Sequence, residues 1–322
     1  MNKSAIVTGA TGFIGSYLVR ELLQNGYRVC APVRRPDKLK SILKELYHHP
    51  NLLVVEADLE ENWSEKMPQK DFSIFYHLGW SGVNREEIDD EEIHKKSLHN
   101  SKKCLEIAHK LGCDCFVNVG SKAEYGKQDY VQDENVLCKP ENAYGKAKLS
   151  FYEYAHAYCK KTGMQFYHAR LFSVIGVGDH PWSLVSAACR KFAMGEEMHF
   201  GPCLQKWNFT AVEDVVKGLR LLAECEIKTD DHGIYNIAGN DTRVLRDFVQ
   251  EIHRICNSQS SMYFSQEPTN GDFMNPSTER IRKLTGWKED YTFEESIRRI
   301  LKECNRKNAN HHKENNEGRN CP

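Results

Sequence analysis

The stretch "TGATGFIG" near the start of the chain restricts the possible folds more than any other feature. Gly9, Gly12 and Gly15 follow an apolar run at 4–9 and precede an amphipathic pattern over 13–26. A strand, a glycine turn and a helix in this order are typical of a dinucleotide-binding unit, because glycine permits the tight turn and the close approach of a pyrophosphate. The helix N-terminus adds unpaired N–H groups and a positive dipole end. We therefore expect a bound dinucleotide here rather than a turn without a ligand.

The rest of the first half of the chain indicates the fold class. Apolar runs rich in Val, Ile and Phe alternate with helical patterns such as the one over 99–112. The further runs lie at 27–33, 51–57, 72–78, 115–120 and 165–172. Strands that are apolar on both faces and alternate with helices form parallel sheets covered on both sides. The sequence predicts an α/β fold, a Rossmann doubly wound parallel sheet with a smaller C-terminal substrate domain.

The pattern changes beyond residue 172. The Rossmann domain is predicted over 1–172, with segments near 207–240 returning to it, and the substrate-binding domain over 173–302. Helical patterns return at 212–225, 243–256 and 291–303. The segment 303–322 carries almost nothing apolar, and it is expected to be a disordered tail.

Composition narrows the class of partner. The 322 residues carry a formal net charge of −1, so no global basic field points to nucleic acid or an anionic membrane. No apolar run approaches the ~18 residues that span a bilayer. The 12 cysteines are scattered, without the spacing of a zinc site, and are expected to be reduced thiols in the cytoplasm. No metal is predicted.

Two arginines end the second predicted strand, at Arg34 and Arg35. In a dinucleotide fold this position faces the adenosine ribose, and a carboxylate there binds the hydroxyls of NAD. Here the next acid is Asp37. A guanidinium suits a phosphate, so the pair indicates NADP(H), while NAD(H) with two solvated arginines is the alternative. Asp58, after the third strand, either binds the adenine amine or caps the next turn.

A second group of residues predicts catalysis. Tyr144 and Lys148 in "NAYGKAKLS" lie four residues apart, on one face of a helix. An ammonium beside a phenol lowers the pKa of the phenol from about 10, which makes Tyr144 a candidate general acid or base. Ser121, at the carboxyl end of the fifth strand, supplies a hydroxyl for the reacting oxygen.

These motifs resemble those of the extended short-chain dehydrogenase/reductases, in the NAD-dependent epimerase/dehydratase family that acts mainly on nucleotide sugars. The resemblance covers about residues 3–302 and also rests on "YHLGWSG", "GSKAEYG", "RLFSVIGVGD", "FTAVEDVV" and "YNIAG". It implies that Tyr144 is the acid or base, Lys148 binds the nicotinamide ribose and Ser121 holds the reacting oxygen. The cofactor-binding residues that it implies are Gly9, Thr11, Gly12, Phe13, Ile14, Gly15, Asp58, Leu59, His77, Leu78 and Gly79.

Several positions depart from the family pattern. Lys122 and Ala123 stand where the dehydratase branch has an Asp-Glu pair, which disfavours 4,6-dehydration. Ser173 replaces an amide that contacts substrate, and Trp207 replaces an arginine that grips the substrate diphosphate; Lys206 or Arg170 is the candidate replacement. Trp207 either stacks on substrate or packs in the core. Trp80 and Trp182 are candidates for lining the sugar pocket.

The leading hypothesis is an NADPH-dependent reductase of a keto group on a nucleotide-activated deoxysugar, with the proton from Tyr144. One alternative is an NAD-dependent nucleotide-sugar 4-epimerase, which uses the same residues and keeps its cofactor. Another is a catalytically silent dinucleotide-binding sensor. The resemblance also implies a homodimer formed through helices around 86–112 and 143–162.

Overall fold

The computed structural model describes residues 3–67, 71–225, 233–267 and 273–317, with only the backbone over 307–317. The chain divides into two compact units. The first consists of residues 1–172, 212–238 and 276–288, and the second of 173–211, 239–275 and 289–322. The sequence predicted that segments near 207–240 return to the first unit; in the structure, residues 212–238 and 276–288 belong to it.

A parallel sheet organises the first unit, and the described residues contribute seven strands to it. Each strand pairs in parallel with its neighbour. In sheet order the strands are β10 (Ile234–Ile237), β6 (Gln165–Leu171), β5 (Cys115–Ser121), β4 (Ile74–His77), β1 (Ser4–Thr8), β2 (Arg28–Val33) and β3 (Leu52–Glu56). The predicted doubly wound Rossmann sheet is confirmed.

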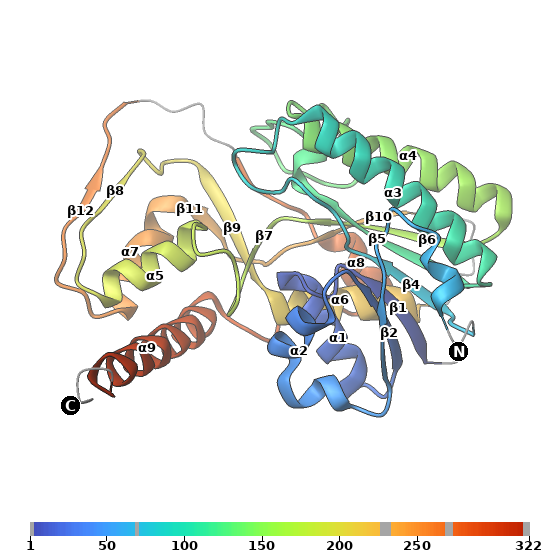
Figure 1. Ribbon diagram of the computed structural model, residues 1–322. Coiled ribbons are helices and arrows are strands. Elements are labelled where there is room, and N and C mark those ends of the chain that lie inside the picture. Colours follow the sequence, from blue (N-terminus) through green and yellow to red (C-terminus); the bar gives the residue numbers. More distant parts are fainter. Residues whose placement is uncertain (1–2, 68–70, 226–232, 268–272, 318–322) are drawn as a thin grey trace. The chain divides into compact units, whose positions relative to one another are not determined.

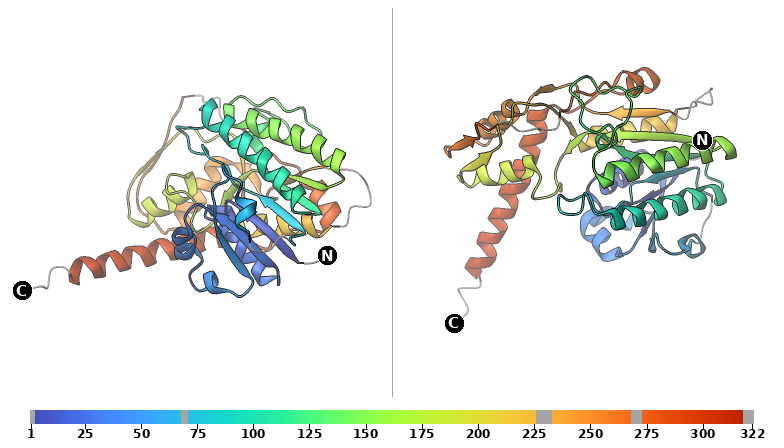
Figure 2. Two further views of the ribbon diagram at one scale, coloured as in Figure 1. Left: turned by 45° about the vertical axis from the view of Figure 1, so that its right-hand side comes forward. Right: turned by 90° about the horizontal axis from the view of Figure 1, so that it is seen from above.

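Helices cover both faces of this sheet (Figure 1). On one face α3 (Glu91–Lys110) and α4 (Ala143–Thr162) lie side by side, as the two views of Figure 2 also show. On the other face α1 (Phe13–Gln24) packs against α6 (Val212–Glu224). The remaining helices of the unit are α2 (Pro36–Leu43), α8 (Glu279–Thr285) and the short 3-10 helices η1 (Lys44–His48), η2 (Trp63–Lys66) and η3 (Lys122–Glu124).

The face under α3 and α4 is held by packed aromatic rings. Phe75 stacks on Phe116 with ring centroids 5.1 Å apart, and Phe151 of α4 lies 6.3 Å from Phe116. All three rings are fully buried. Burying such rings stabilises the fold by about 1.5–3 kcal/mol each, so this contact fixes α4 on the sheet.

The second unit has its own core. Phe209, Phe248 and Phe293 pack ring against ring, with centroids 4.7–5.6 Å apart. Its described strands form two small sheets, β11 (Thr242–Val244), β9 (Lys206–Ala211) and β7 (Ser173–Ile175), and β12 (Met262–Phe264) with β8 (Met198–Phe200). Its helices are α5 (Leu184–Ala193), α7 (Leu245–Ile255) and α9 (Phe293–Glu317).

The C-terminal segment differs from its prediction. Helix α9 continues to Glu317, where a disordered tail was expected from 303 onward. Its sequence contains Lys, Glu, Arg and Asn but neither Gly nor Pro before residue 318, so nothing in it breaks a helix. Residues 318–322 of the predicted tail lie outside the described part. In the described part of the chain, no helix combines the length and the apolar character needed to cross a membrane.

Candidate active site

The glycine loop joins β1 to α1 through close backbone contacts. Gly9 has a φ of +73°, a conformation that favours glycine. A Cβ added at Gly15 would lie 2.2 Å from the carbonyl oxygen of Gly9, so only glycine lets the helix start this close to the loop. Gly12 is the N-cap of α1, no side chain caps the helix, and its first turn holds no acidic residue. The N–H groups of Phe13, Ile14 and Gly15 are thus suited to a pyrophosphate.

A buried chain of hydrogen bonds supports the floor beside this loop. The Thr8 hydroxyl accepts from the backbone N–H groups of Leu78 and Gly79 and lies 2.9 Å from Nδ1 of His77. Nε2 of His77 lies 2.8 Å from the Ser101 hydroxyl, which itself donates to the Ser97 carbonyl. Burial lowers the pKa of His77 to about 3, so the ring is neutral. His77, predicted to contact the cofactor, lies beneath the floor and supports it.

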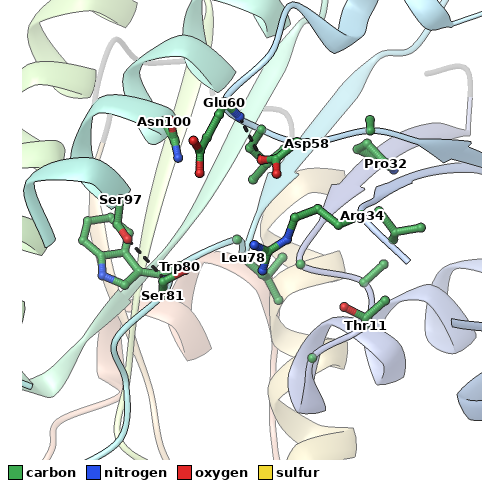
Figure 3. A pocket seen from close by; sticks show the side chains of 17 residues that line it. Thr11, Pro32, Arg34, Asp58, Glu60, Leu78, Trp80, Ser81, Ser97 and Asn100 are labelled. Carbon is green, nitrogen blue, oxygen red and sulfur yellow. Dashed lines mark hydrogen bonds between the residues drawn. The ribbon is translucent and has the colours of Figure 1, made fainter. Parts of the chain in front are cut away.

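A cavity of about 210 Å³ opens above the loop (Figure 3). Its wall brings together the carboxyl ends of β1, β2, β3 and β4. The predicted residues that line it are Gly9, Thr11, Gly12, Arg34, Asp58, Leu59, Leu78, Gly79 and Trp80. The side chain of Arg34 points into it, and Asp58 lies beside Arg34, at the end of the neighbouring strand β3 (Figure 3). One oxygen of Asp58 accepts from the N–H of Glu60 at 3.1 Å, so this carboxylate caps a turn and also faces the cavity.

Arg35 lies outside the cavity, at the N-cap of α2. It borders an adjoining groove with Arg34, Asp37, Lys38 and Glu56. Three of these five side chains are cationic and two are acidic, so the groove next to the adenosine end of the cavity has a net positive charge that favours an anion.

Backbone contact brings Ser121 and Tyr144 together. A Cβ at Gly145 would lie 2.4 Å from the carbonyl oxygen of Ala123, so glycine lets α4 begin against η3. The Ser121 hydroxyl accepts from the N–H of Ala123 at 3.1 Å, which leaves its own proton free to donate. The Ser121 side chain lies close enough to Tyr144 to lower its pKa as a hydrogen-bond donor. Two of the predicted catalytic residues therefore meet at the carboxyl end of β5.

Lys148 lies one helical turn further along α4 and is buried. Its Nζ donates to the carbonyl oxygen of Val119 at 2.9 Å and lies 4.0 Å from the centre of the Trp80 ring. The distance from Nζ to the centre of the Tyr144 ring is 5.7 Å. The ammonium thus faces the indole and a carbonyl more closely than it faces the phenol.

Burial shifts the pKa values of both Tyr144 and Lys148. It raises the pKa of Tyr144 to about 12, although the hydrogen bond from Ser121 lowers it. Burial also lowers the pKa of Lys148 to about 7, against the charge of Glu124. Burial is the largest influence on the pKa of Tyr144, and the lowering expected from Lys148 stays a prediction. Tyr144 is therefore held as a proton donor.

A buried charge cluster lies behind Ser121, and sequence reasoning missed it. One oxygen of Glu124 accepts from the N–H of Ser121 at 2.7 Å, and the other lies 2.8 Å from both Nε2 of His168 and Nε of Arg170. A Cβ at Gly120 would clash with Glu124 and His168, so glycine makes room for them. The signal in the sequence was a pair of polar residues, His168 and Arg170, inside an apolar strand. The cluster fixes the backbone of the serine.

This cluster overturns one candidate. Arg170 is 1% exposed and paired with Glu124, so it cannot grip a substrate diphosphate. Lys206 is exposed and remains available.

Four predicted substrate residues belong to the second unit. Ser173 donates to the sulfur of Met274, whose N–H donates to the carbonyl oxygen of Lys206, so β7 and β9 hold these residues near one another. Trp207 is half-buried against the core of this unit, in agreement with the packing alternative. Trp182 is 60% exposed and stacks on His180 at 4.5 Å.

A family model, described as the NAD dependent epimerase/dehydratase family, matches residues 5–238. The chain belongs to this family. Its members are oxidoreductases and epimerases of the extended short-chain dehydrogenase/reductase type, so the chain is an enzyme of that class and the resemblance is confirmed.

Proteins of known name match most of the chain. CDP-abequose synthase of Salmonella muenchen is 24% identical over 94% of this chain and 98% of its own. UDP-glucose 4-epimerase of Thermotoga maritima, solved with UDP-glucose, matches with a TM-score of 0.81 at 23% identity over 95% of this chain and 99% of its own. RMD from Pseudomonas aeruginosa, solved with NADPH, matches with a TM-score of 0.74 at 19% identity, over 94% and 98%.

The residues present fit a nicotinamide dinucleotide, the cofactor class of this family. The uncapped N-terminus of α1 suits the pyrophosphate, and only glycine at position 15 lets this helix start close against the Gly9 loop. Arg34 and Asp58 line the cavity, and their contact with the adenosine end, like that of Lys148 with the nicotinamide ribose, stays a prediction.

Proposed function

We propose that the enzyme reduces a keto group on a nucleotide-activated deoxysugar with NADPH. The observation that carries this proposal is the placement of Arg34 in the wall of the dinucleotide cavity, with Arg35 and Lys38 on the adjoining groove. NAD sites place a carboxylate at the end of the second strand. Here Glu56 of β3 and Asp37 of α2 are the acids on the groove, and three cations oppose them. That balance favours a 2′-phosphate.

The protonation of the site supports the reductive direction. A raised pKa keeps Tyr144 protonated at neutral pH, ready to donate to a carbonyl oxygen as negative charge develops there. Ser121, whose hydroxyl accepts from the N–H of Ala123, can donate its proton to the same oxygen. The nicotinamide, when bound, supplies the hydride equivalent. The Lys148 ammonium lies on the same helix face and stabilises the phenolate that remains after proton donation.

An NAD-dependent nucleotide-sugar 4-epimerase is the second candidate. It is favoured by the similarity to a solved UDP-glucose 4-epimerase and uses the same serine, tyrosine and lysine. Such an enzyme needs tightly retained NAD⁺ and shows no net consumption of NADPH. A silent sensor would bind the dinucleotide and turn over neither kind of substrate.

The experiment is a comparison of Arg34→Asp with the wild-type enzyme. We would identify any nucleotide released from the purified protein and measure the Kd for NADPH and NADH. The wild type is expected to prefer NADPH, and the variant is expected to lose about ten- to a hundredfold of that preference, the value of a charged hydrogen bond.

Lys40→Asp is the matched control, because Lys40 is exposed on helix α2, six residues after Arg34, but does not line the cavity or the groove. It should keep the preference of the wild type. Tightly retained NAD⁺ in the wild type, or an unchanged preference in Arg34→Asp, would reject the reductase in favour of the epimerase.

We also propose that the substrate is a nucleoside-diphosphate sugar and that the enzyme forms a homodimer through α3 and α4. The cytoplasmic location stays a prediction. Light scattering in solution tests the dimer.

A further inference from the structure

The side chain of Trp80 stands between two parts of the site. On one side it lines the dinucleotide cavity, on the far side of the cavity from Arg34 (Figure 3). On the other side its ring lies 4.0 Å from the Lys148 ammonium and meets the Tyr144 ring edge-on, with centroids 6.2 Å apart. The described lining of the cavity includes neither Lys148 nor Tyr144. The indole therefore closes the cavity on the side of the catalytic pair.

The indole is anchored at one edge. Its N–H donates to Nδ1 of His94 at 3.3 Å, and the rings of the two residues stack. Nε2 of His94 lies 3.1 Å from the carbonyl oxygens of both Glu87 and Ile88. Because a carbonyl only accepts, Nε2 must carry the proton and Nδ1 is fixed as the acceptor. The tautomer of His94 thus holds the indole in one orientation, through a single and rather long hydrogen bond.

The other contact of the indole is with the charge of Lys148. A desolvated ammonium over an indole face is stabilised by cation–π attraction. The only other described contact of this Nζ with a hydrogen-bond acceptor is the Val119 carbonyl. The indole, which lines the cavity, therefore stands between the cavity and the ammonium, which does not line it.

We propose that Trp80 is a gate, which the nicotinamide half of the cofactor displaces from Lys148 when it binds. This inference rests on the proposed function, since it takes Lys148 as the partner of the nicotinamide ribose. The ribose hydroxyls exchange with the indole as partners of the ammonium. The adenosine half does not reach the gate, because its end of the cavity is formed by Arg34 and Asp58. Displacing the indole then costs part of the binding free energy, so the whole dinucleotide binds more weakly than it would without Trp80.

The test compares two ligands on Trp80→Ala and Trp80→Phe. Calorimetry with NADP⁺ measures displacement of the gate, and adenosine 2′,5′-bisphosphate, which lacks the nicotinamide half, reports the rest of the site. Trp80→Ala should bind NADP⁺ about three- to thirtyfold more tightly than the wild type, the range of a cation–π contact, with unchanged affinity for the fragment. Trp80→Phe keeps a ring without the N–H and should gain less. NAD⁺ and ADP serve in the same way if the enzyme prefers NAD.

Intrinsic emission gives a second readout. Addition of NADP⁺ should change the tryptophan emission of the wild type but not that of Trp80→Phe. Trp182→Phe is the control: Trp182 is exposed and belongs to the second unit, so this variant should respond as the wild type does. Equal or weaker binding of NADP⁺ by Trp80→Ala would overturn the gate, because the indole would then be a fixed platform. If the wild type binds neither dinucleotide nor fragment, the proposed function itself fails and the gate falls with it.

Discussion

Glu124 lies at the centre of a group of charges that no water reaches. Its carboxylate and the guanidinium of Arg170 are 0% and 1% exposed. Burial alone would raise the pKa of Glu124, but the guanidinium charge of Arg170 and the hydrogen bonds from His168 and Arg170 hold it at about 2. His168 donates from Nε2 because Asn118 donates to its Nδ1, and it is neutral because burial lowers its pKa. The ion pair thus orients Ser121 without adding net charge to the site.

We predict that Glu124→Gln lowers the free energy of unfolding by about 3–5 kcal/mol, because the buried charge of Arg170 loses its counter-ion. Urea denaturation measures the loss. Glu106→Gln, on the exposed face of α3, should change stability by less than about 0.5 kcal/mol. Adding Arg170→Met to Glu124→Gln should restore most of the loss, because a neutral pair needs no counter-ion. A double variant less stable than the single one would show that the ion pair itself stabilises the fold.

Helix α1 depends on how closely its first turn approaches the loop before it. A Cβ at Gly15 would lie 2.2 Å from the backbone oxygen of Gly9, whereas one at Gly12 would lie 3.1 Å from the same atom. The first contact can be relieved only by moving the helix, and the second by a shift of a few tenths of an ångström.

Gly15→Ala should therefore weaken cofactor binding more than tenfold and lower the thermal midpoint by several degrees, because α1 must retreat from the pyrophosphate site. Gly12→Ala keeps the helix in place and should lower the midpoint less. Differential scanning fluorimetry with and without NADPH measures both effects. Equal midpoints for the two variants would contradict this account of the loop.

The sequence was informative at this scale wherever the signal was local. The glycine loop, six strands of the central sheet and the Ser121–Tyr144–Lys148 set follow from short patterns. Strand β10 was not predicted as a strand, because its four residues are too few for a period and its partner β6 lies far back in the chain. The Glu124 cluster and the contact of Trp80 with Lys148 join residues 46 and 68 positions apart, so no local pattern contains them.

For the whole molecule, three buried groups contribute to the response to acid, since the pKa values of His77, His168 and Glu124 are all lower in the fold than in the unfolded chain. His77 has a pKa of about 3 in the fold against 6.5 when exposed, so the unfolded chain binds an extra proton and stability falls as pH drops from 6.5 to 3. Glu124 has a pKa of about 2 against 4.5, so its contribution is present above pH 4.5 and is lost as pH falls toward 2. Stability should fall continuously below pH 6.5.

The wild-type free energy of unfolding should rise with pH between 4.5 and 6.5, in part because the unfolded chain binds one more proton at His77 than the fold does. We predict that His77→Gln lowers this slope by about 1.4 kcal/mol per pH unit, the value of one proton. Urea unfolding at a series of pH values gives the slope. His99→Gln, at an exposed position of α3, is the control and should leave the slope between pH 4.5 and 6.5 unchanged. If both variants keep the wild-type slope, another group is responsible.

The central sheet is assembled from stretches that lie far apart along the chain, and this has a consequence during synthesis. Strand β10 pairs with β6, and the indole of Trp287 donates to the Asp214 carbonyl oxygen of α6 at 2.9 Å. A ribosome that adds about 5–20 residues per second therefore exposes β6 as an open sheet edge for several seconds before its neighbour emerges. Nascent chains of this enzyme should need protection by a chaperone until residue 288 has left the ribosome.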